Sequence, residues 1–417
     1  MSPEVRDRID QIQHGNVPEG YVKTRSEIVP ASWTPACLGD IYTERKEPGN
    51  ESLPLLTVSI HSGVSDGELD EDELPKKVKR IEDKSQYKRA ATGDLVFNMM
   101  RAWQGAIGTV RTEGMVSPAY IVAKPNDKVY PPFMDYYMKS ARMVGIINRQ
   151  SYGVTDFRKR LYWDSFAPIP CILPPVAEQK KIAEILATQD KAIELQARKI
   201  EELKRFKQGC LERMFPRKGQ KVPEKRFPGF AGDWEQRKLG DVFEEYSEKN
   251  HSELPVLTIL QGSGTIPRDE SDRKLLYDKS NLSNYKMVHE GDFIVHLRSF
   301  EGGLEIATNT GIISPAYHTF HGENTDSRFY YSYFRSKRFV DIDLKPHVYG
   351  IRDGRSIDIE GMKTIKIPFT GYEEQKAIGA YIRNLDNLIT LHQRKLDEMK
   401  KMKKALMQLL LTGIVRV

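Results

Sequence analysis

The sequence has few cysteines, no long apolar run and no recognisable signal segment. Its three cysteines are odd in number and widely spaced, which argues against a disulfide framework or a zinc knuckle. No stretch approaches the roughly 18 apolar residues that a membrane helix needs, and the charged N-terminus lacks an apolar signal region. We therefore expect a cytoplasmic protein that does not enter a membrane.

Catalytic motifs are also missing. No GxxxxGK[ST] loop is present. Tyr130-Pro131-Pro132-Phe133 is similar to the (Asn/Asp)-Pro-Pro-(Phe/Tyr/Trp) motif of amino-methyltransferases, but Tyr130 has no amide or carboxylate to accept from a base's amino group. No nucleophile lies beside a base, and no set of metal ligands is complete. We expect a non-catalytic chain that itself binds no cofactor or metal.

An internal repeat dominates what is present. Its offset falls in order from 201 to 196 residues, as small insertions and deletions in a true duplication produce. The repeated motifs are Trp33–Asp40 with Trp234–Asp241, Leu53–Thr57 with Leu254–Thr258, Ser117–Tyr120 with Ser314–Tyr317, Tyr152–Val154 with Tyr349–Ile351, and Glu178–Lys180 with Glu374–Lys376. The segments between the motifs differ sharply, so the halves share a scaffold and differ where loops and recognition surfaces lie.

Each half ends in a heptad-patterned segment. Residues 177–214 contain no proline and one glycine, and the apolar register returns 196 residues later. A seven-residue apolar period predicts a supercoiled helix pair, and two helices of one chain joined this way pair antiparallel. The expected coiled-coil core is Leu186, Ile193, Ile200, Leu203, Ile382, Ile389, Leu396 and Met399.

Polar residues interrupt this seam at Gln189, Gln196, Lys207, His392 and Lys403. They are either tolerated surface residues or polar residues that set the register.

The globular part of each half has the pattern of a mixed α/β domain. Leu53–Ile60, Leu254–Leu260, Leu95–Asn98 and Phe293–His296 are expected strands, and residues 132–148 and 326–340 are expected helices. The predicted fold class is α+β, with two mixed α/β domains joined by two long helices in an antiparallel coiled coil, as a pseudo-twofold repeat. The expected spans are 1–173 and 223–369 for the domains, and 174–222 and 370–417 for the helices.

The net charge of +6 lies in the helical segments. Residues 177–225 carry +5 and residues 371–417 carry +4, whereas 1–176 is neutral and 226–370 carries −3. A surface for duplex DNA would therefore come from local basic clusters within neutral domains. Any one cluster is more simply a solvated face, but the clusters recur at equivalent places in both halves, next to glycine and aromatic residues.

The two helices begin with related signatures. Pro174-Pro175-Val176-Ala177-Glu178-Gln179-Lys180 precedes the first, and Glu374-Gln375-Lys376 opens the second, where Phe369–Tyr372 replaces the Pro-Pro-Val-Ala part. Each domain opens with Trp-(x)5-Gly-Asp and contains Ser-Pro-Ala-Tyr. Over nearly its whole length the chain resembles the specificity subunit of type I restriction–modification systems.

This resemblance implies that each domain is a target recognition domain for one half of a split DNA sequence. The helices would set the spacing of the half-sites and bind two methyltransferase (modification) subunits, and two restriction (motor/nuclease) subunits would join the complex. S-adenosylmethionine, ATP and Mg²⁺ would be bound by those partner subunits. Because the recognition segments differ, we expect an asymmetric target on double-stranded DNA.

The candidate DNA-binding residues are Lys79, Arg80, Lys84, Lys88, Arg101, Ser151, Tyr152, Gly153, Arg158, Lys159 and Arg160 in the first half, and Arg268, Arg273, Lys274, His296, Arg298, Tyr349, Gly350, Arg352 and Arg355 in the second. We assign phosphate contacts to Lys79, Arg80, Lys88 and Lys159. Base edges are assigned to Arg101, Arg158, Arg298, Arg352 and Arg355, because a guanidinium can bind guanine with two hydrogen bonds. The Tyr-Gly pairs are either loops that approach DNA or ordinary turns beside a core tyrosine.

Two other functions compete with this interpretation. One is a coiled-coil scaffold that joins two protein partners without DNA, which would account for the helices and the near-neutral domains. The other is a fused enzyme that both recognises and methylates DNA, which the missing cofactor loop disfavours.

Overall fold

The computed structural model describes residues 3–24, 27–60, 63–67, 83–153, 158–270, 279–350 and 355–417. These residues form two compact units: unit 1 is Met1–Leu195 with Leu396–Val417, and unit 2 is Gln196–Lys395. Each unit contains one globular part and a portion of both long helices, so the units cross the spans expected from the sequence. None of the described helices combines the length and apolar character that crossing a bilayer requires.

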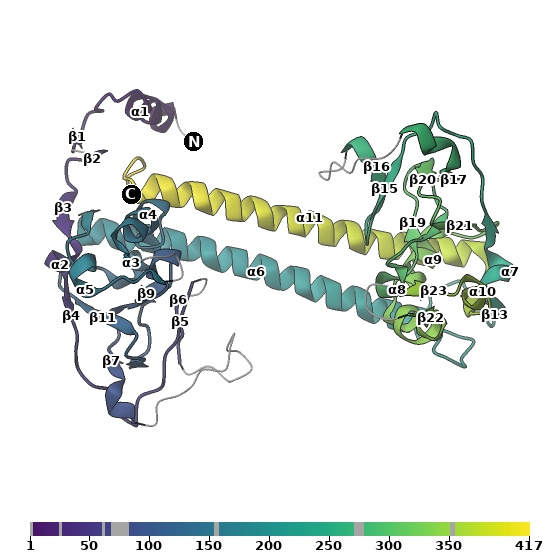
Figure 1. Ribbon diagram of the computed structural model, residues 1–417, viewed down its shortest axis with the longest axis horizontal. Coiled ribbons are helices and arrows are strands. Elements are labelled where there is room, and N and C mark those ends of the chain that lie inside the picture. The colour runs from purple at the N-terminus through teal and green to yellow at the C-terminus, as the bar shows by residue number, and fades with distance from the viewer. Residues whose placement is uncertain are drawn as a thin grey trace. The chain divides into compact units, whose positions relative to one another are not determined.

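Unit 1 is built mainly from short strands (Figure 1). Its elements are α1 (Pro3–Gln13), β1 (Tyr21–Lys23), β2 (Ile28–Pro30), β3 (Thr34–Cys37), α2 (Leu38–Ile41), β4 (Tyr42–Glu44), β5 (Val58–Ser59), β6 (Gly63–Val64), η2 (Lys84–Gln86), β7 (Lys88–Ala90), β8 (Leu95–Asn98), η3 (Ala102–Gln104), β9 (Ile107–Thr109), β10 (Gly114–Val116), β11 (Tyr120–Pro125), α3 (Pro131–Tyr137), α4 (Ala141–Gln150), α5 (Trp163–Phe166), β12 (Pro170–Leu173) and the first part of α6 (Val176–Met214).

Unit 2 repeats most of this order from the equivalent of β3 onward. Its elements are β13 (Glu235–Lys238), α7 (Leu239–Val242), β14 (Glu244–Tyr246), β15 (Leu257–Leu260), β16 (Gly264–Pro267), η5 (Arg268–Glu270), η6 (Lys279–Asn284), β17 (Lys286–Val288), β18 (Phe293–Val295), α8 (Ser299–Gly302), β19 (Glu305–Ile306), β20 (Gly311–Ile313), β21 (His318–His321), α9 (Ser327–Phe334), the π-helix η7 (Phe339–Leu344), η8 (Lys345–His347), β22 (Val348–Tyr349), β23 (Ser356–Ile357), α10 (Ile359–Lys363), β24 (Lys366–Phe369) and the first part of α11 (Tyr372–Leu411).

The central sheet has the same topology in both units. Four antiparallel strands follow the order β4-β11-β8-β9 in unit 1 and β14-β21-β18-β19 in unit 2. The smaller pairs also correspond: β3 with β12 matches β13 with β24, β7 with β10 matches β17 with β20, and β5 with β6 matches β15 with β16. The repeat inferred from the sequence is therefore a repeat of strand pairing.

Each central sheet separates two cores, because alternate side chains of a strand point to opposite faces. Leu95 and Phe97 of β8 enter the larger core of unit 1, and Val96 enters a smaller core on the other face. In unit 2, Phe293 and Ile294 divide in the same way. The larger cores are closed by α3 and α4 in unit 1 and by α9 in unit 2, together with residues of both long helices.

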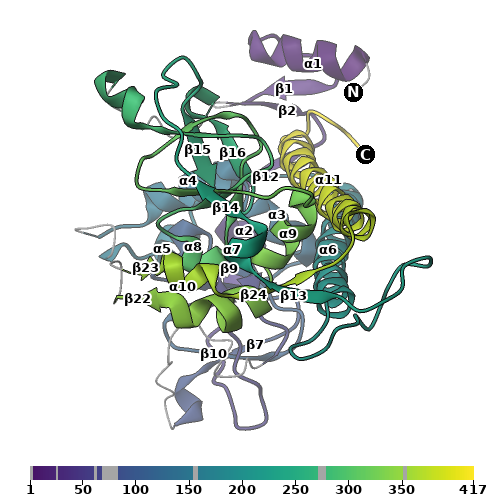
Figure 2. The ribbon, with the colours of Figure 1, turned by 90° about the vertical axis from the view of Figure 1, so that its right-hand side faces the viewer.

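The long helices run antiparallel within each unit (Figure 1 and Figure 2). In unit 2, Gln196 of α6 donates to the His392 carbonyl of α11 at 2.8 Å, and Lys207 pairs with Asp386 at 2.6 Å. In unit 1, Lys403 pairs with Asp190. Four of the five predicted polar seam residues, Gln196, Lys207, His392 and Lys403, thus bond from one helix to the other. The lysine–aspartate pair is the same pair in the two repeats.

The seam positions differ in burial. Ile200, Leu203 and Leu396 are buried, and Ile193, Ile389 and Met399 are partly buried. Leu186 and Ile382 are fully buried, but they belong to the larger cores of the globular parts. The helices therefore connect directly to the domains rather than forming an isolated rod.

Several expected elements are shorter or broken. The helix expected over 326–340 is α9, which ends at Phe334, and the π-helix η7, which begins at Phe339. The strand expected over 254–260 begins only at Leu257. The helix expected over 132–148 is two helices, α3 and α4, because Ser140 caps a new helix by accepting from the Met143 N–H at 3.3 Å. The strand expected over 53–60 is only Val58–Ser59. Pro54 and the neighbouring Leu55 instead bond or bridge to Met115, which keeps that segment beside the sheet.

Candidate nucleic-acid interface

Two loops that are far apart in the sequence share one surface of unit 1. The first follows β8, and the second follows α4. The Leu161 N–H donates to the Met99 carbonyl at 2.9 Å, which joins the loops, and Tyr152 and Arg160 form an isolated antiparallel bridge. The Lys159 ammonium lies 5.3 Å from the centre of the Trp103 ring, in cation–π range.

The same two loops meet in unit 2. The first follows β18 and contains α8, and the second is the β22–β23 hairpin. The Arg355 guanidinium lies 5.1 Å from the centre of the Phe300 ring. Phe300 corresponds to Trp103 at offset 197. Tyr152 pairs with Arg160 and Tyr349 with Ser356, so this strand register aligns Arg355 with Lys159. The duplication therefore preserved a cation–aromatic contact while both residue types changed.

Exposed arginines and tyrosines surround these contacts. Tyr152 and Tyr349 are both 59% exposed, which excludes the alternative of a tyrosine in the core. Two arginines are exposed on each of these surfaces: Arg101 and Arg158 in unit 1, and Arg298 and Arg355 in unit 2. Each unit thus presents guanidinium groups and an aromatic ring at corresponding positions, a combination that suits contact with nucleic acid.

A glycine follows each of these tyrosines, and the two loops require glycine for different reasons. A Cβ at Gly153 would lie 2.4 Å from the Arg158 carbonyl oxygen, so a side chain would push the loop apart. Gly350 has a φ of 89°, a left-handed conformation that favours glycine. In both loops the glycine lets the chain turn tightly beside the exposed tyrosine.

Two exposed apolar side chains were not among the predicted site residues. Met100 is 41% exposed and Leu297 is 68% exposed. They correspond at offset 197, and each directly precedes an exposed arginine, Arg101 or Arg298. The sequence did carry a signal, because both residues follow a predicted strand and precede an arginine. It was missed because an apolar residue directly after a strand is easily assigned to the strand itself.

His296 supports the loop from inside. Its Nδ1 accepts from the Arg298 N–H at 3.2 Å, and burial lowers its pKa to about 4, with a further contribution from Arg335. The ring is therefore neutral near pH 7. Its Nε2 is buried without a hydrogen-bond partner among the described residues, so the structure gives His296 a positioning role for Arg298.

Two predicted residues point into the fold, which argues against their expected contacts with DNA. The Lys88 Nζ donates to the Tyr120 carbonyl at 2.7 Å, and burial lowers its pKa. Its equivalent Lys286 donates to the Tyr317 carbonyl at 2.6 Å, so these lysines anchor the two Ser-Pro-Ala-Tyr motifs. Ser151 is buried and its Oγ donates to the Ile147 carbonyl at 2.8 Å, which ends α4.

The remaining predicted residues fall into two groups. Arg160 and Arg268 are partly buried; Arg160 donates to the Lys159 carbonyl at 3.1 Å and Arg268 to Thr258 Oγ1 at 3.4 Å. The other group lies outside the described residues: Lys79, Arg80, Arg273, Lys274 and Arg352, together with the side chain of Lys84.

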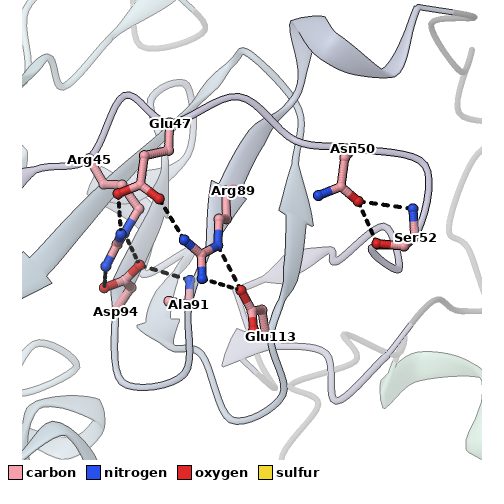
Figure 3. A network of polar contacts seen from close by, with 8 residues as sticks. All are labelled: Arg45, Glu47, Asn50, Ser52, Arg89, Ala91, Asp94 and Glu113. Atoms are coloured by element: carbon pink, nitrogen blue, oxygen red, sulfur yellow. Dashed lines mark hydrogen bonds and ion pairs between the residues drawn. The ribbon is translucent and has the colours of Figure 1, made fainter.

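A polar network fixes the start of β8 and so the position of the first loop in unit 1 (Figure 3). The buried Asp94 carboxylate accepts from Arg45 Nε at 2.7 Å and from the Ala91 N–H at 2.8 Å. Arg45 also donates to Glu47, and Arg89 bridges Glu47 and Glu113. The Gly-Asp motif is thus a buried anchor for the strand that leads to the loop.

The Glu-Gln pair of each helix signature ties the helix to the domain. Glu178 accepts from Trp33 Nε1 at 3.2 Å and from Arg416 Nε at 2.6 Å. The Gln179 amide accepts from the Tyr130 N–H and donates to the Pro174 carbonyl, at 2.8 and 2.9 Å. The signature therefore holds the start of α6 against the globular part of unit 1.

The second signature does the same in unit 2. Glu374 accepts from Trp234 Nε1 at 3.1 Å and from Arg226 Nε at 2.6 Å. Gln375 accepts from the Asp326 N–H at 3.0 Å and donates to the Thr370 carbonyl at 2.7 Å. The Trp-(x)5-Gly-Asp and Glu-Gln motifs, about 140 residues apart in each half, are therefore two sides of one buried contact.

Comparison with known proteins identifies the family. Residues 62–205 and 231–401 match the family described as the type I restriction modification DNA specificity domain. The chain is 27% identical to the type I restriction enzyme MjaVIII specificity subunit of Methanocaldococcus jannaschii, over 96% of each chain.

Solved structures share the fold. The HsdS subunit from Thermoanaerobacter tengcongensis matches with a TM-score of 0.51 and 18% identity, covering 93% of this chain and 98% of that one. A chain from a structure titled for complex assembly of the type I R-M system matches with a TM-score of 0.55 and 17% identity, covering 93% and 99%. At this identity the likeness supports the architecture of two domains and two long helices.

Proposed function

This chain belongs to the type I restriction modification DNA specificity family, and we propose that its two exposed loop surfaces, one in each unit, read the two halves of a split DNA target. The observation that carries this proposal is the duplicated surface itself. Both units combine an exposed arginine after the central strand, a cation over an aromatic ring and an exposed tyrosine. The family recognises DNA sequence, and these surfaces are where the chain offers groups for it.

The charged groups divide between two tasks. Arg101 and Arg298 lie at loop tips and are our candidates for base edges, together with Arg158 and Arg355. Lys159 is positioned by Trp103 and by Asn148 Oδ1 at 3.1 Å and is our candidate for a phosphate. Lys79, Arg80, Arg273, Lys274 and Arg352 remain predictions from the sequence.

The target should be asymmetric, because the corresponding loops carry different side chains. Trp103 and Lys159 in unit 1 correspond to Phe300 and Arg355 in unit 2. Mapping methylated adenines across the genome with and without the gene tests this. A two-part motif with a fixed gap and two different halves is expected, and unchanged methylation would refute the proposal.

The helices offer matching sites for two copies of a partner. Unit 2 exposes Phe206 and Leu391, and unit 1 exposes their equivalents Met402 and Leu195, each 196 residues away. Apolar side chains repeated in this way on charged helices suit the docking of one identical subunit on each unit. We assign these sites to two methyltransferase subunits, and we expect two restriction subunits to complete the complex in the cytoplasm.

The chemistry would belong to those partners. S-adenosylmethionine would be held by the methyltransferase subunits, and ATP and Mg²⁺ by the restriction subunits. The described residues contain no group of three or more His, Cys, Asp or Glu placed to hold a metal ion. What this chain's residues would do is bind and orient the duplex.

The scaffold alternative gains no support from the relatives. It makes a different prediction in a binding assay with the methyltransferase partner present. Sequence-specific binding of a duplex containing the mapped target supports recognition of DNA, and its affinity should fall steeply with salt because lysine and arginine displace counterions from phosphates.

Arg352→Ala should relax specificity at one half-site only; uniformly weaker binding would mark Arg352 as a phosphate contact.

A further inference from the structure

Hydrogen bonds close the turn that exposes an apolar side chain in each unit, Leu297 in unit 2 and Met100 in unit 1. In unit 2 the Ser299 N–H donates to the His296 carbonyl at 3.0 Å, and the His296 N–H donates to Ser299 Oγ at 2.9 Å. Ser299 is fully buried. These bonds close a tight turn after β18, so Leu297 cannot fold back into the core and stays 68% exposed.

The turn in unit 1 is closed by similar bonds. The Arg101 N–H donates to the Asn98 carbonyl at 3.0 Å, and the Met100 N–H donates to Asn98 Oδ1 at 2.9 Å. Ala102 is fully buried directly after this turn. Met100 is therefore presented at the tip in the same way, although the unit 2 loop is one residue shorter.

A single exposed apolar side chain needs no special explanation. Here, however, it occurs in both units, at the tip of the loop that carries the exposed arginine. Folding does not require it, since the turn is held by backbone bonds and by buried Ser299 or Ala102. A flexible, unbranched Met at one tip and a branched Leu at the other also differ in shape, as expected of residues that discriminate.

We propose that Leu297 and Met100 are specificity-determining residues that contact the C5-methyl group of a thymine, one in each half-site. The thymine methyl is the apolar group that a base pair presents in the major groove, and it distinguishes A·T from the other pairs there. The adjacent Arg298 and Arg101 would bind a neighbouring base edge. This inference rests on the proposed function, because it requires that these loops read DNA.

Deoxyuridine provides a direct probe, since it differs from thymidine only by the missing methyl. The complex of this chain with its methyltransferase subunit is titrated with duplexes carrying the mapped target, in which each thymine is replaced in turn by deoxyuridine. Because burial of one methyl favours binding, its loss predicts about three- to fivefold weaker binding at one position in each half-site. In the Leu297→Ala complex one of these positions should lose its sensitivity, and in the Met100→Ala complex the other should.

Two further variants control the test. Leu297→Met keeps an apolar contact and should retain the deoxyuridine effect. Ile342→Ala removes an exposed apolar side chain of unit 2 that lines a hollow against α6 rather than the loop, and it should change nothing.

The outcomes separate this inference from the proposed function. Absence of any sequence-specific binding refutes the proposed function itself. Specific binding to a half-site made only of G·C pairs overturns the inference, as does specific binding that no deoxyuridine weakens. Uniformly weaker binding of Leu297→Ala with unchanged deoxyuridine sensitivity would also overturn it, and would show that Leu297 supports the loop instead.

Discussion

The two units have a buried aspartate at the same turn, but different side chains bind its carboxylate. In unit 1 Asp94 accepts from Arg45, which belongs to the arginine–glutamate network of Figure 3. In unit 2 the equivalent Asp292 accepts from Tyr246 Oη at 2.5 Å and lies 2.6 Å from His321 Nδ1. The duplication kept the aspartate before the loop that follows the central strand, while the side chains that bind its carboxylate diverged.

The contacts at the helix starts show a second difference. Both glutamates bind a tryptophan and an arginine, but Arg416 comes from the segment after α11 and Arg226 from the segment after α6. The side chain of Arg226 is 14% exposed and that of Arg416 is 38% exposed. The unit 2 contact is therefore drier and should contribute more to stability.

Replacement of the buried glutamates is the largest expected effect. Glu374→Ala leaves Arg226, Trp234 Nε1 and Thr370 Oγ1 without their shared acceptor, and we expect a loss of about 3–5 kcal/mol in unit 2. Glu178→Ala should cost unit 1 about 2–3 kcal/mol, because Arg416 reaches water more easily. Amide hydrogen exchange resolved by residue measures each unit separately. Equal losses in both units would contradict the difference in burial.

The arginines should show the same order with smaller losses. Arg226→Ala should cost unit 2 about 2 kcal/mol, because the buried Glu374 carboxylate loses a two-bond partner. Arg416→Ala should cost unit 1 about 1 kcal/mol, since its side chain is partly solvated. Hydrogen exchange again provides the measurement, with each variant serving as the control for the other unit. An effect of Arg416→Ala on unit 2 would be inconsistent with this assignment.

The sequence predicted the helices well because their signal is local and periodic. It predicted the strand Leu95–Asn98 because a Gly-Asp turn directly precedes this short apolar run. The sequence did not predict the long-range contacts that explain what the motifs do. Arg416 meets Glu178 across 238 positions, and nothing near either residue indicates the other. Lys88 looked like a phosphate ligand because lysine is usually exposed, whereas its amine is bound by the Tyr120 carbonyl.

The stability of the two units should depend differently on pH below 6.5. The His296 ring is buried and neutral in the folded protein, with its pKa lowered to about 4, whereas an unfolded histidine takes up a proton near pH 6.5. The contribution of His296 to the stability of unit 2 is thus fully present above pH 6.5. It falls between pH 6.5 and 4, by at most about 1.4 kcal/mol per pH unit. Unit 1 has the non-titrating Asn98 at this position.

The His296→Asn variant tests this directly. Its unit 2 should lose that part of the pH dependence, while unit 1 serves as the internal reference in the same hydrogen-exchange experiment. If the slope between pH 6.5 and 4 is unchanged in the variant, a group other than His296 is responsible for it.

The long helices should respond alike, in contrast to the domains they connect. Lys207 pairs with Asp386 in unit 2, and Lys403 pairs with Asp190 in unit 1, with side chains of similar exposure. Partly exposed ion pairs contribute little, so Lys207→Met and Lys403→Met should each cost at most about 1 kcal/mol, by equal amounts. Thermal unfolding at low and high salt measures both. A clear inequality would mean that the helices, like the loops, have diverged. Equality would confine the divergence to the domains, as the docking of one identical subunit on each unit proposed above would require.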